Sequence, residues 1–183
     1  MKLSIHSFCV TLVAVLLLLS GFPNPSWGQK SNKPAPIKWL TLEKAAALSR
    51  KEPRKIVVDV YTDWCGWCKK MDKSTFTDPA VVDYVNKNFY AVKLNAESRK
   101  PITINGKTYQ YNAQMRAHEA ALALLQGQMS YPTTVYLDER MGIISPVPGY
   151  LDASMFRTIL SYFGEDHYKQ KTFAEYTAAT KAK

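Results

Sequence analysis

Cysteine and histidine are scarce in this chain of 183 residues, which has only three of each. Cys9 lies in an apolar leader, so a processed chain would keep one cysteine pair, Cys65 and Cys68, with His118 and His167. A structural zinc ion takes four ligands, and a disulfide-built secreted domain uses several bridges. The scarcity therefore excludes a disulfide scaffold and argues against bound metal. It indicates that the single Cys-x-x-Cys pair has a chemical role.

A hydrophobic run long enough to span a bilayer is also missing from the leader. Its apolar stretch, residues 8–19, has about 12 residues, whereas a membrane helix needs roughly 20. Ser26 and Gly28 are small residues with the spacing of a cleavage site. We therefore predict that residues 1–28 are a secretory signal peptide rather than a membrane anchor. The mature protein would be periplasmic or otherwise secreted.

The charge is one-sided, with 24 Lys and Arg against 15 Asp and Glu and a net charge of +9. The lysines are scattered and have no interleaved aromatic pattern, so we expect no nucleic-acid binding. A basic surface that favours acidic partners or membrane surfaces is the simpler interpretation. Without the leader, about 155 residues remain, which suits one domain with a real core.

The cysteine pair follows a β-branched run. Residues 55–61 predict a buried strand, and residues 66–73 predict a helix, so the pair lies at a strand-to-helix turn. The N-terminus of a helix stabilises a thiolate on the first cysteine, and the second thiol can then resolve a mixed disulfide. We expect Cys65 to be the exposed nucleophile and Cys68 the buried resolving partner.

Caps, turn residues and periodicity predict the other elements. We expect a flexible lead at 29–36, one domain at 37–164 and a polar tail at 165–183 with at most a weak helix. Helices are predicted at 37–51 with Thr41 as a cap, from Asp78-Pro79 onward, at 113–126 and at 152–163. Strands are predicted at 90–95, 133–137 and 142–147, and a hairpin at 102–109 about Asn105-Gly106.

The sequence Trp64-Cys65-Gly66-Trp67-Cys68-Lys69 after an apolar strand resembles the thioredoxin family, in particular its exported thiol:disulfide interchange members. The resemblance covers roughly 37–163 and includes four further family positions: Asp59, Lys93, Pro132 and Gly149. It implies a thioredoxin-like α/β fold, a central mixed sheet flanked by helices. The chain departs from thioredoxin at Trp67, where thioredoxin has proline, and in an insert at about 96–128 before the cis-proline loop.

The resemblance gives Asp59 and Lys93 roles at the site. Asp59 interrupts an apolar strand, and burial should raise its pKa, which suits a base that deprotonates Cys68 through water. The alternative is an edge-strand aspartate that faces solvent. Lys93 matches the family lysine that pairs with this carboxylate, although it could also be an ordinary surface lysine.

Five residues are candidates for substrate contact. A cis bond before Pro132 would expose the Tyr131 backbone beside Cys65 for an extended substrate segment; alternatively the proline simply ends a loop. Trp64, Gly66 and Trp67 would form the apolar contact surface, although the tryptophans could instead belong to the core. The insert would be either a lid or docking element, or a loop extension without a role.

The function predicted from these residues is an extracytoplasmic thiol–disulfide oxidoreductase that reduces protein disulfides without a bound cofactor. Its partners would be protein disulfides and a membrane or soluble thiol electron donor, and we expect a monomer. Two alternatives remain open at this point. One is a disulfide oxidase or isomerase with the same site. The other is a non-enzymatic binding module or a copper chaperone, with Met71 or Met129 beside the thiolates.

Overall fold

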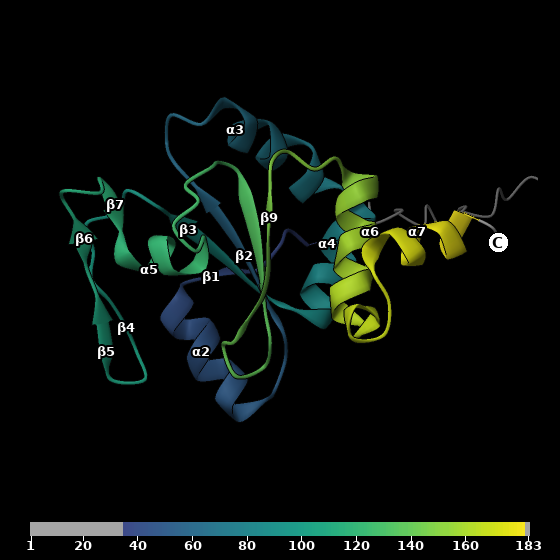
Figure 1. Ribbon diagram of the computed structural model, residues 1–183, viewed down its shortest axis with the longest axis horizontal. Helices are drawn as coiled ribbons and strands as arrows, with labels where there is room; N and C mark the ends of the chain where they lie inside the picture. The colour runs from purple at the N-terminus through teal and green to yellow at the C-terminus, as the bar shows by residue number, and fades with distance from the viewer. Residues whose placement is uncertain (1–34, 182–183) are drawn as a thin grey trace, which may run out of the picture. The chain divides into compact units, whose positions relative to one another are not determined.

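A computed structural model describes residues 35–181 (Figure 1). The predicted signal peptide and most of the predicted flexible lead lie outside the described residues. Within residues 35–181, no helix is both long and apolar enough to cross a bilayer.

The centre of the fold is a five-stranded mixed sheet in the order β1-β3-β2-β8-β9. Its strands are β1 (Trp39–Leu40), β2 (Ile56–Tyr61), β3 (Tyr90–Asn95), β8 (Thr133–Leu137) and β9 (Ile143–Pro148). Strands β1 and β2 run parallel to β3, whereas β8 is antiparallel to both β2 and β9. The predicted strands are confirmed to within a residue or so at their ends. Strand β2 is central, so its residues have neighbouring strands on both sides.

Helices cover both faces of the sheet, as Figure 1 shows. On one face lie α2 (Leu42–Lys51) and α5 (Glu119–Leu124), and on the other lie α4 (Pro79–Asn88) and α6 (Ala153–Gly164). Val58 and Val60 belong to the first core cluster, whereas Val57 belongs to the second. Because side chains alternate along a strand, Asp59 points to the face that α4 and α6 cover. The predicted α/β fold with a flanked mixed sheet is confirmed.

The first predicted helix begins later than expected. Residues 37–40 are extended, and β1 pairs with β3 in register Trp39↔Ala91. Thr41 caps the helix as predicted, since its hydroxyl accepts a hydrogen bond from the Lys44 N–H at 3.3 Å. The prediction was wrong for 37–41 because Ile37 is buried in the core cluster under α4 and α6. Sheet pairing, a long-range contact, outweighs local helix preference there.

The insert contains the predicted hairpin, but its helix is much shorter than 113–126. Strands β4 (Ile102–Ile104) and β5 (Lys107–Tyr109) flank the Asn-Gly turn. A second small hairpin, β6 (Tyr111–Asn112) with β7 (Ala117–His118), occupies the predicted first turns of the helix. Polar side chains favour this turn, because Asn112 Oδ1 accepts the Met115 N–H and His118 Nδ1 accepts the Ala120 N–H. Helix α5 therefore starts only after His118.

The insert is built into the core rather than appended to it. Ile102, Ala120, Ala121, Leu124 and Leu125 are buried in the same cluster as the central strand. The side-chain nitrogens of His118, which is fully buried, bond the Lys100 carbonyl and the Ala120 N–H. The segment is therefore more than a loop extension, and it forms part of the layer that covers one sheet face.

The C-terminal segment packs against α6 through aromatic side chains. A 3₁₀ turn (His167–Lys169) and α7 (Phe173–Lys181) follow α6. The Tyr162 ring on α6 lies 5.3 Å from the Phe173 ring and 5.4 Å from the Tyr176 ring, measured between centroids. A helix is present in the predicted tail, and its two apolar residues explain why it packs.

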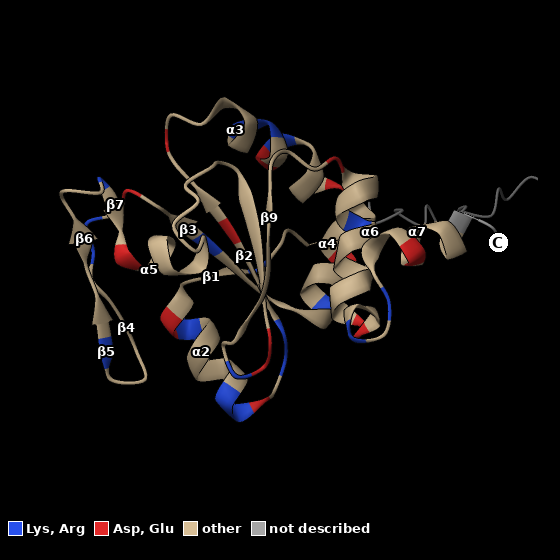
Figure 2. Cartoon of the chain, in the orientation of Figure 1, with Lys and Arg blue, Asp and Glu red and all other residues tan. Residues whose placement is uncertain are grey.

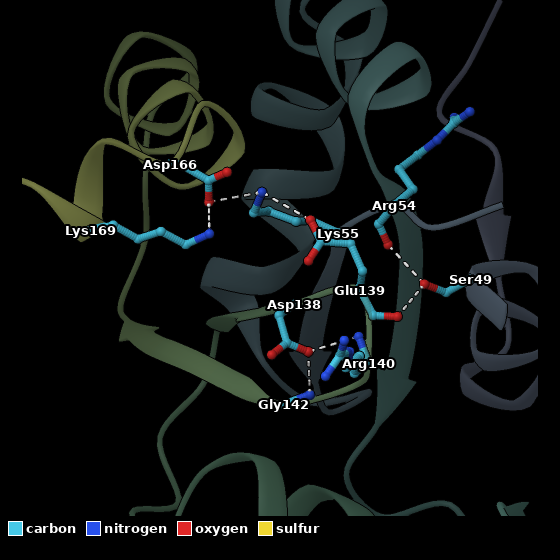
Figure 3. Close-up of polar contacts among 9 residues, drawn as sticks. All are labelled: Ser49, Arg54, Lys55, Asp138, Glu139, Arg140, Gly142, Asp166 and Lys169. Carbon is cyan, nitrogen blue, oxygen red and sulfur yellow. Dashed lines mark hydrogen bonds and ion pairs between the residues drawn. The ribbon is translucent and has the colours of Figure 1, made fainter.

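A buried lysine ties this segment to the start of β2 (Figure 3). Lys55 Nζ lies 3.1 Å from Glu139 Oε1, in the β8–β9 turn, and 3.1 Å from Asp166 Oδ1. Burial alone would lower the pKa of Lys55, but its bonds to Asp166 and Glu139 outweigh burial and raise it. This cluster lies at the end of β2 opposite to the cysteine pair.

Candidate active site

The two cysteines lie where β2 passes into α3 (Gly66–Lys73), at the predicted helix boundary. They form a disulfide with a sulfur–sulfur distance of 2.02 Å. Cys65 is the N-cap of α3, and its Sγ accepts a hydrogen bond from the Cys68 N–H at 3.0 Å. The free N–H groups and the positive end of the helix dipole thus act on the Cys65 sulfur, which favours its thiolate over that of Cys68.

The expectation that Cys65 is exposed is wrong for the disulfide form. Cys65 and Cys68 have 4% and 2% of their surface exposed, so both are buried. The disulfide accounts for this, because it turns the Cys65 side chain back over the first turn of α3, where it meets the Cys68 N–H. Gly66, between the cysteines, is exposed, and a Cβ there would meet nothing within 4 Å.

Asp59 is buried, as predicted, and its alternative as a solvent-facing edge residue is excluded. Only 2% of the residue is exposed, and it lies between Lys93 of β3 and Thr134 of β8 in the sheet register. Lys93 Nζ lies 2.8 Å from Asp59 Oδ2, so the predicted pairing is confirmed. The contact is an ion pair without hydrogen-bond geometry, and within residues 35–181 neither carboxylate oxygen accepts a hydrogen bond. Burial raises the pKa of Asp59 above its ordinary value, and the Lys93 charge only partly offsets that effect.

Lys93 also donates a hydrogen bond to Asp72 on α3, a residue that sequence reasoning missed. Burial would lower the pKa of Lys93, but the two carboxylates outweigh burial and raise it. The ammonium therefore stays charged between a buried and an exposed carboxylate. Asp72 lies four residues after Cys68, so a helical wheel of α3 could have placed it near the site.

Aromatic side chains surround the cysteines, as expected for a contact surface. Trp64 and Trp67 are 66% and 56% exposed, so neither belongs to the core. The Trp64 ring meets the Tyr131 ring edge-on at 5.9 Å, and the Trp67 ring lies 5.3 Å from the Tyr150 ring. The peptide bond before Pro132 is cis, as predicted. These contacts bring Tyr131, from the loop before β8, beside the residue that precedes Cys65.

Glu97 is a second residue that the sequence did not indicate. Its Oε1 accepts a hydrogen bond from the Trp64 indole N–H at 2.9 Å. The Glu97 backbone N–H is in turn held by Asn95 Oδ1 at 2.9 Å, directly at the end of β3. The pKa of Tyr131 is raised, first by burial and then by the Glu97 charge. The insert therefore touches the site through Glu97.

The ligands considered for metal binding lie apart. Met71 is fully buried in the cluster under α4 and α6, whereas Met129 packs against the cluster on the other sheet face. Both ring nitrogens of His118 are occupied by backbone groups. In the described part of the chain, no three His, Cys, Asp or Glu side chains are placed to share a metal ion.

The mixed sheet and the Cys-x-x-Cys disulfide at a helix N-terminus define a protein of the thiol–disulfide oxidoreductase class. Residues 42–164 match the family model described as a thioredoxin-like domain, which is more than half of the chain, so the chain belongs to this family.

Curated relatives agree with this class. The chain is 30% identical over 115 residues to the thiol:disulfide interchange protein DsbD of Pectobacterium atrosepticum, covering 62% of this chain and 17% of that protein. It is 32% identical over 111 residues to DsbD of Tatumella citrea, covering 60% and 16%. The chain thus spans about a sixth of the length of these relatives.

Two solved structures show the same fold. The DsbH oxidoreductase has a TM-score of 0.54 at 14% identity, over 73% of this chain and 88% of that one. A Helicobacter pylori thioredoxin-fold protein has a TM-score of 0.52 at 21% identity, over 70% and 81%.

Proposed function

We propose that the protein reduces disulfide bonds of other proteins outside the cytoplasm. The observation that carries this proposal is the Cys65–Cys68 disulfide at the start of α3, with the buried carboxylate of Asp59 on the strand that leads to it. A disulfide-forming pair whose first cysteine is the N-cap of a helix, with a buried carboxylate as base, is suited to two-electron exchange with another disulfide.

The reaction would run in two exchanges. The Cys65 thiolate attacks one sulfur of the substrate disulfide; a new sulfur–sulfur bond forms, the old one breaks, and the other substrate sulfur leaves as a thiolate. Cys68, deprotonated by Asp59, then attacks Cys65 and releases the second substrate thiolate. The substrate gains two electrons, and its two thiolates are protonated. The protein is left with the Cys65–Cys68 disulfide.

A dithiol donor must then reduce this disulfide, because the chain needs two electrons for each further turnover. The predicted leader at residues 1–28 supports a location in the periplasm or another secreted compartment, where a thiol donor has to be supplied. The relatives' name, thiol:disulfide interchange protein, supports a partner that exchanges thiols for the disulfide. We propose a membrane or soluble thiol carrier in this role and no bound cofactor.

The direction of electron flow follows from what stands between the cysteines. A strong oxidant of this class needs an unusually stable thiolate, and Gly66 and Trp67 offer it no charge. Lys70, one turn further, has its Nζ 4.8 Å from the Trp67 ring centre. The Lys70 ammonium therefore contacts aromatic rings rather than the cysteine sulfurs. Without a charge beside it the thiolate is not unusually stable, which favours a reducing protein over an oxidase.

Trapping experiments on the full chain, with Cys9→Ser in every variant so that only Cys65 and Cys68 can react, test the proposal. Cys65→Ser should abolish insulin reduction, whereas Cys68→Ser should accumulate mixed disulfides through Cys65, visible as adducts by mass spectrometry. The Cys65→Ser/Cys68→Ser double variant is the matched control and should form none. Adducts through Cys68 would reverse the assigned roles. Faster oxidation of reduced substrates than reduction of oxidised ones would assign the oxidase function instead.

A further inference from the structure

Each of the two exposed tryptophans beside the cysteines contacts a charged side chain, and the two charges have opposite signs. Trp64 donates its N–H to Glu97, and Trp67 lies under the Lys70 ammonium. Glu97 follows β3, whereas Tyr150, which Trp67 also meets, lies between β9 and α6. In Figure 1 these two connections leave the sheet on opposite sides below α3. The contact surface therefore has two distinct sides.

The Trp64 side is acidic. Asp63 and Glu97 are both exposed, and Asp63 Oδ2 accepts a hydrogen bond from Asn95 Nδ2 at 3.0 Å. Asn95 Oδ1 also accepts the Glu97 backbone N–H, so one amide side chain contacts both acidic residues. Within residues 35–181, no lysine or arginine forms an ion pair with either carboxylate. Arg99, the nearest cation in the sequence, has its guanidinium 4.8 Å above the Tyr111 ring instead.

The Trp67 side is basic. Lys69, Lys70 and Lys73 are exposed on α3, and Lys70 Nζ also lies 5.0 Å from the Tyr150 ring. The single acid of this helix, Asp72, is bonded to Lys93 and so does not neutralise the lysines. Figure 2 shows basic residues along α3 and an acidic residue in the loop that leads into it.

We propose that this polarity selects the substrate: an extended, disulfide-bearing segment with a basic residue on the Trp64 side of its cysteine and an acidic residue on the Trp67 side. The inference rests on the proposed function, since it names the substrates of the same site. Complementary charges around an apolar contact chiefly change association rate and orientation. The charges are exposed and screened by salt, so the expected preference is moderate, about five- to tenfold in kcat/KM at low salt.

The test uses two synthetic peptides of identical composition, each with one cysteine in a mixed disulfide with a chromophoric thiol. One has arginine before and aspartate after the cysteine, and the other has the reverse order; a third has alanine at both places. The wild-type protein should prefer one charged order about five- to tenfold at low salt. The ratio of kcat/KM between the two charged orders should fall toward one at high salt, where the charges are screened. Equal kcat/KM for both orders at low salt would overturn the proposal.

Variants assign the preference to the two charges. Glu97→Gln keeps an oxygen for the Trp64 indole and removes only the charge, and Lys70→Met keeps the length of the side chain. Each should reduce the preference, and Glu97→Lys combined with Lys70→Glu should invert it. The matched controls are Asp83→Asn and Lys87→Met, exposed residues on α4 that change the net charge equally. If the controls reduce the preference as much, net charge rather than the site is responsible.

A binding measurement keeps this inference separate from the proposed function. The same peptides with serine in place of cysteine bind without reaction. The ratio of the Kd values of the two charged orders for the oxidised protein therefore measures the effect of charge order on binding, apart from the reaction. No release of the chromophore from any peptide would refute the reductase function, while unequal Kd values would still support the polarised surface. Equal Kd values with normal turnover would refute the polarised surface alone.

Discussion

Replacing Asp59 by asparagine removes the buried carboxylate and keeps its shape, so it separates the proposed base from the fold. A general base contributes about 10²- to 10⁴-fold to a proton-transfer step. Asp59 would act on Cys68 through water, so we expect the lower end, about 100-fold slower release of the mixed disulfide at pH 7. As the pH rises, hydroxide can increasingly take the proton in place of Asp59, so the difference between the variant and the wild type should shrink toward pH 9.

The effect of Asp59→Asn on stability follows from two opposing terms. At 2.8 Å and an effective dielectric constant of about 20, attraction to Lys93 is about 6 kcal/mol, and desolvation of a buried ion costs several kcal/mol. The raised pKa of Asp59 shows that burial outweighs the attraction. Lys93 keeps Asp72 as a partner. We therefore expect a free energy of unfolding at pH 7 equal to or above that of the wild type.

The same pKa shift predicts the sign of a pH dependence. The pKa of Asp59 is raised in the folded protein. Its contribution to the free energy of unfolding is therefore fully present below the pKa of about 3.9 that an aspartate has in the unfolded chain. It is lost as the pH rises through the folded pKa. The stability of Asp59→Asn should therefore decline less with rising pH in this window, as urea unfolding at a series of pH values would show.

Stopped-flow release of a chromophoric thiol from a preformed Cys65 mixed disulfide, between pH 6 and 9, measures the catalytic effect. A solvent deuterium isotope effect present in the wild type and reduced in Asp59→Asn would identify proton transfer. Asp72→Asn is the matched control, since it removes the exposed carboxylate from the same lysine. Identical pH profiles for Asp59→Asn and the wild type, or an equal loss in Asp72→Asn, would refute the role of Asp59 as the base.

Two further predictions concern the redox potential and the insert. Titration against glutathione should give a midpoint between roughly −200 and −270 mV, since no charged residue stands between Cys65 and Cys68; a value near −120 mV would contradict the proposed direction. Ile102→Ala in the insert hairpin should lower the free energy of unfolding by about 2–3 kcal/mol, because Ile102 is only 8% exposed. The exposed neighbour variant Thr103→Ala should cost less than about 1 kcal/mol. Equal, small losses in chemical denaturation would mean that the hairpin is not part of the core.

Features with a local signal were predictable from the sequence. The run at 55–61 became the central strand, Asp78 caps α4, and Asn105-Gly106 turns the hairpin. Each depends on residues within a few positions of one another, so local preference decides the structure there.

Features set by distant contacts were not predictable in the same way. The strand at Trp39–Leu40 forms only because β3 lies beside it. Asp72 and Glu97 become part of the site through Lys93 and Trp64, which come from other elements. The resemblance covered the residues that carry the chemistry, but the charges that flank the tryptophans depend on where the loops meet.

The polar row at the centre of the sheet has a consequence for folding. Asp59 on β2 stands level with Lys93 on β3 and with Thr134 on β8 in the sheet register. A shift of one residue in β3 would move Lys93 to the opposite face and set Asp59 against Val92 or Leu94. Such a slip would leave the carboxylate buried without its ammonium, which costs several kcal/mol. The residue proposed as the base would thus also discriminate against misaligned strand pairings while the chain folds.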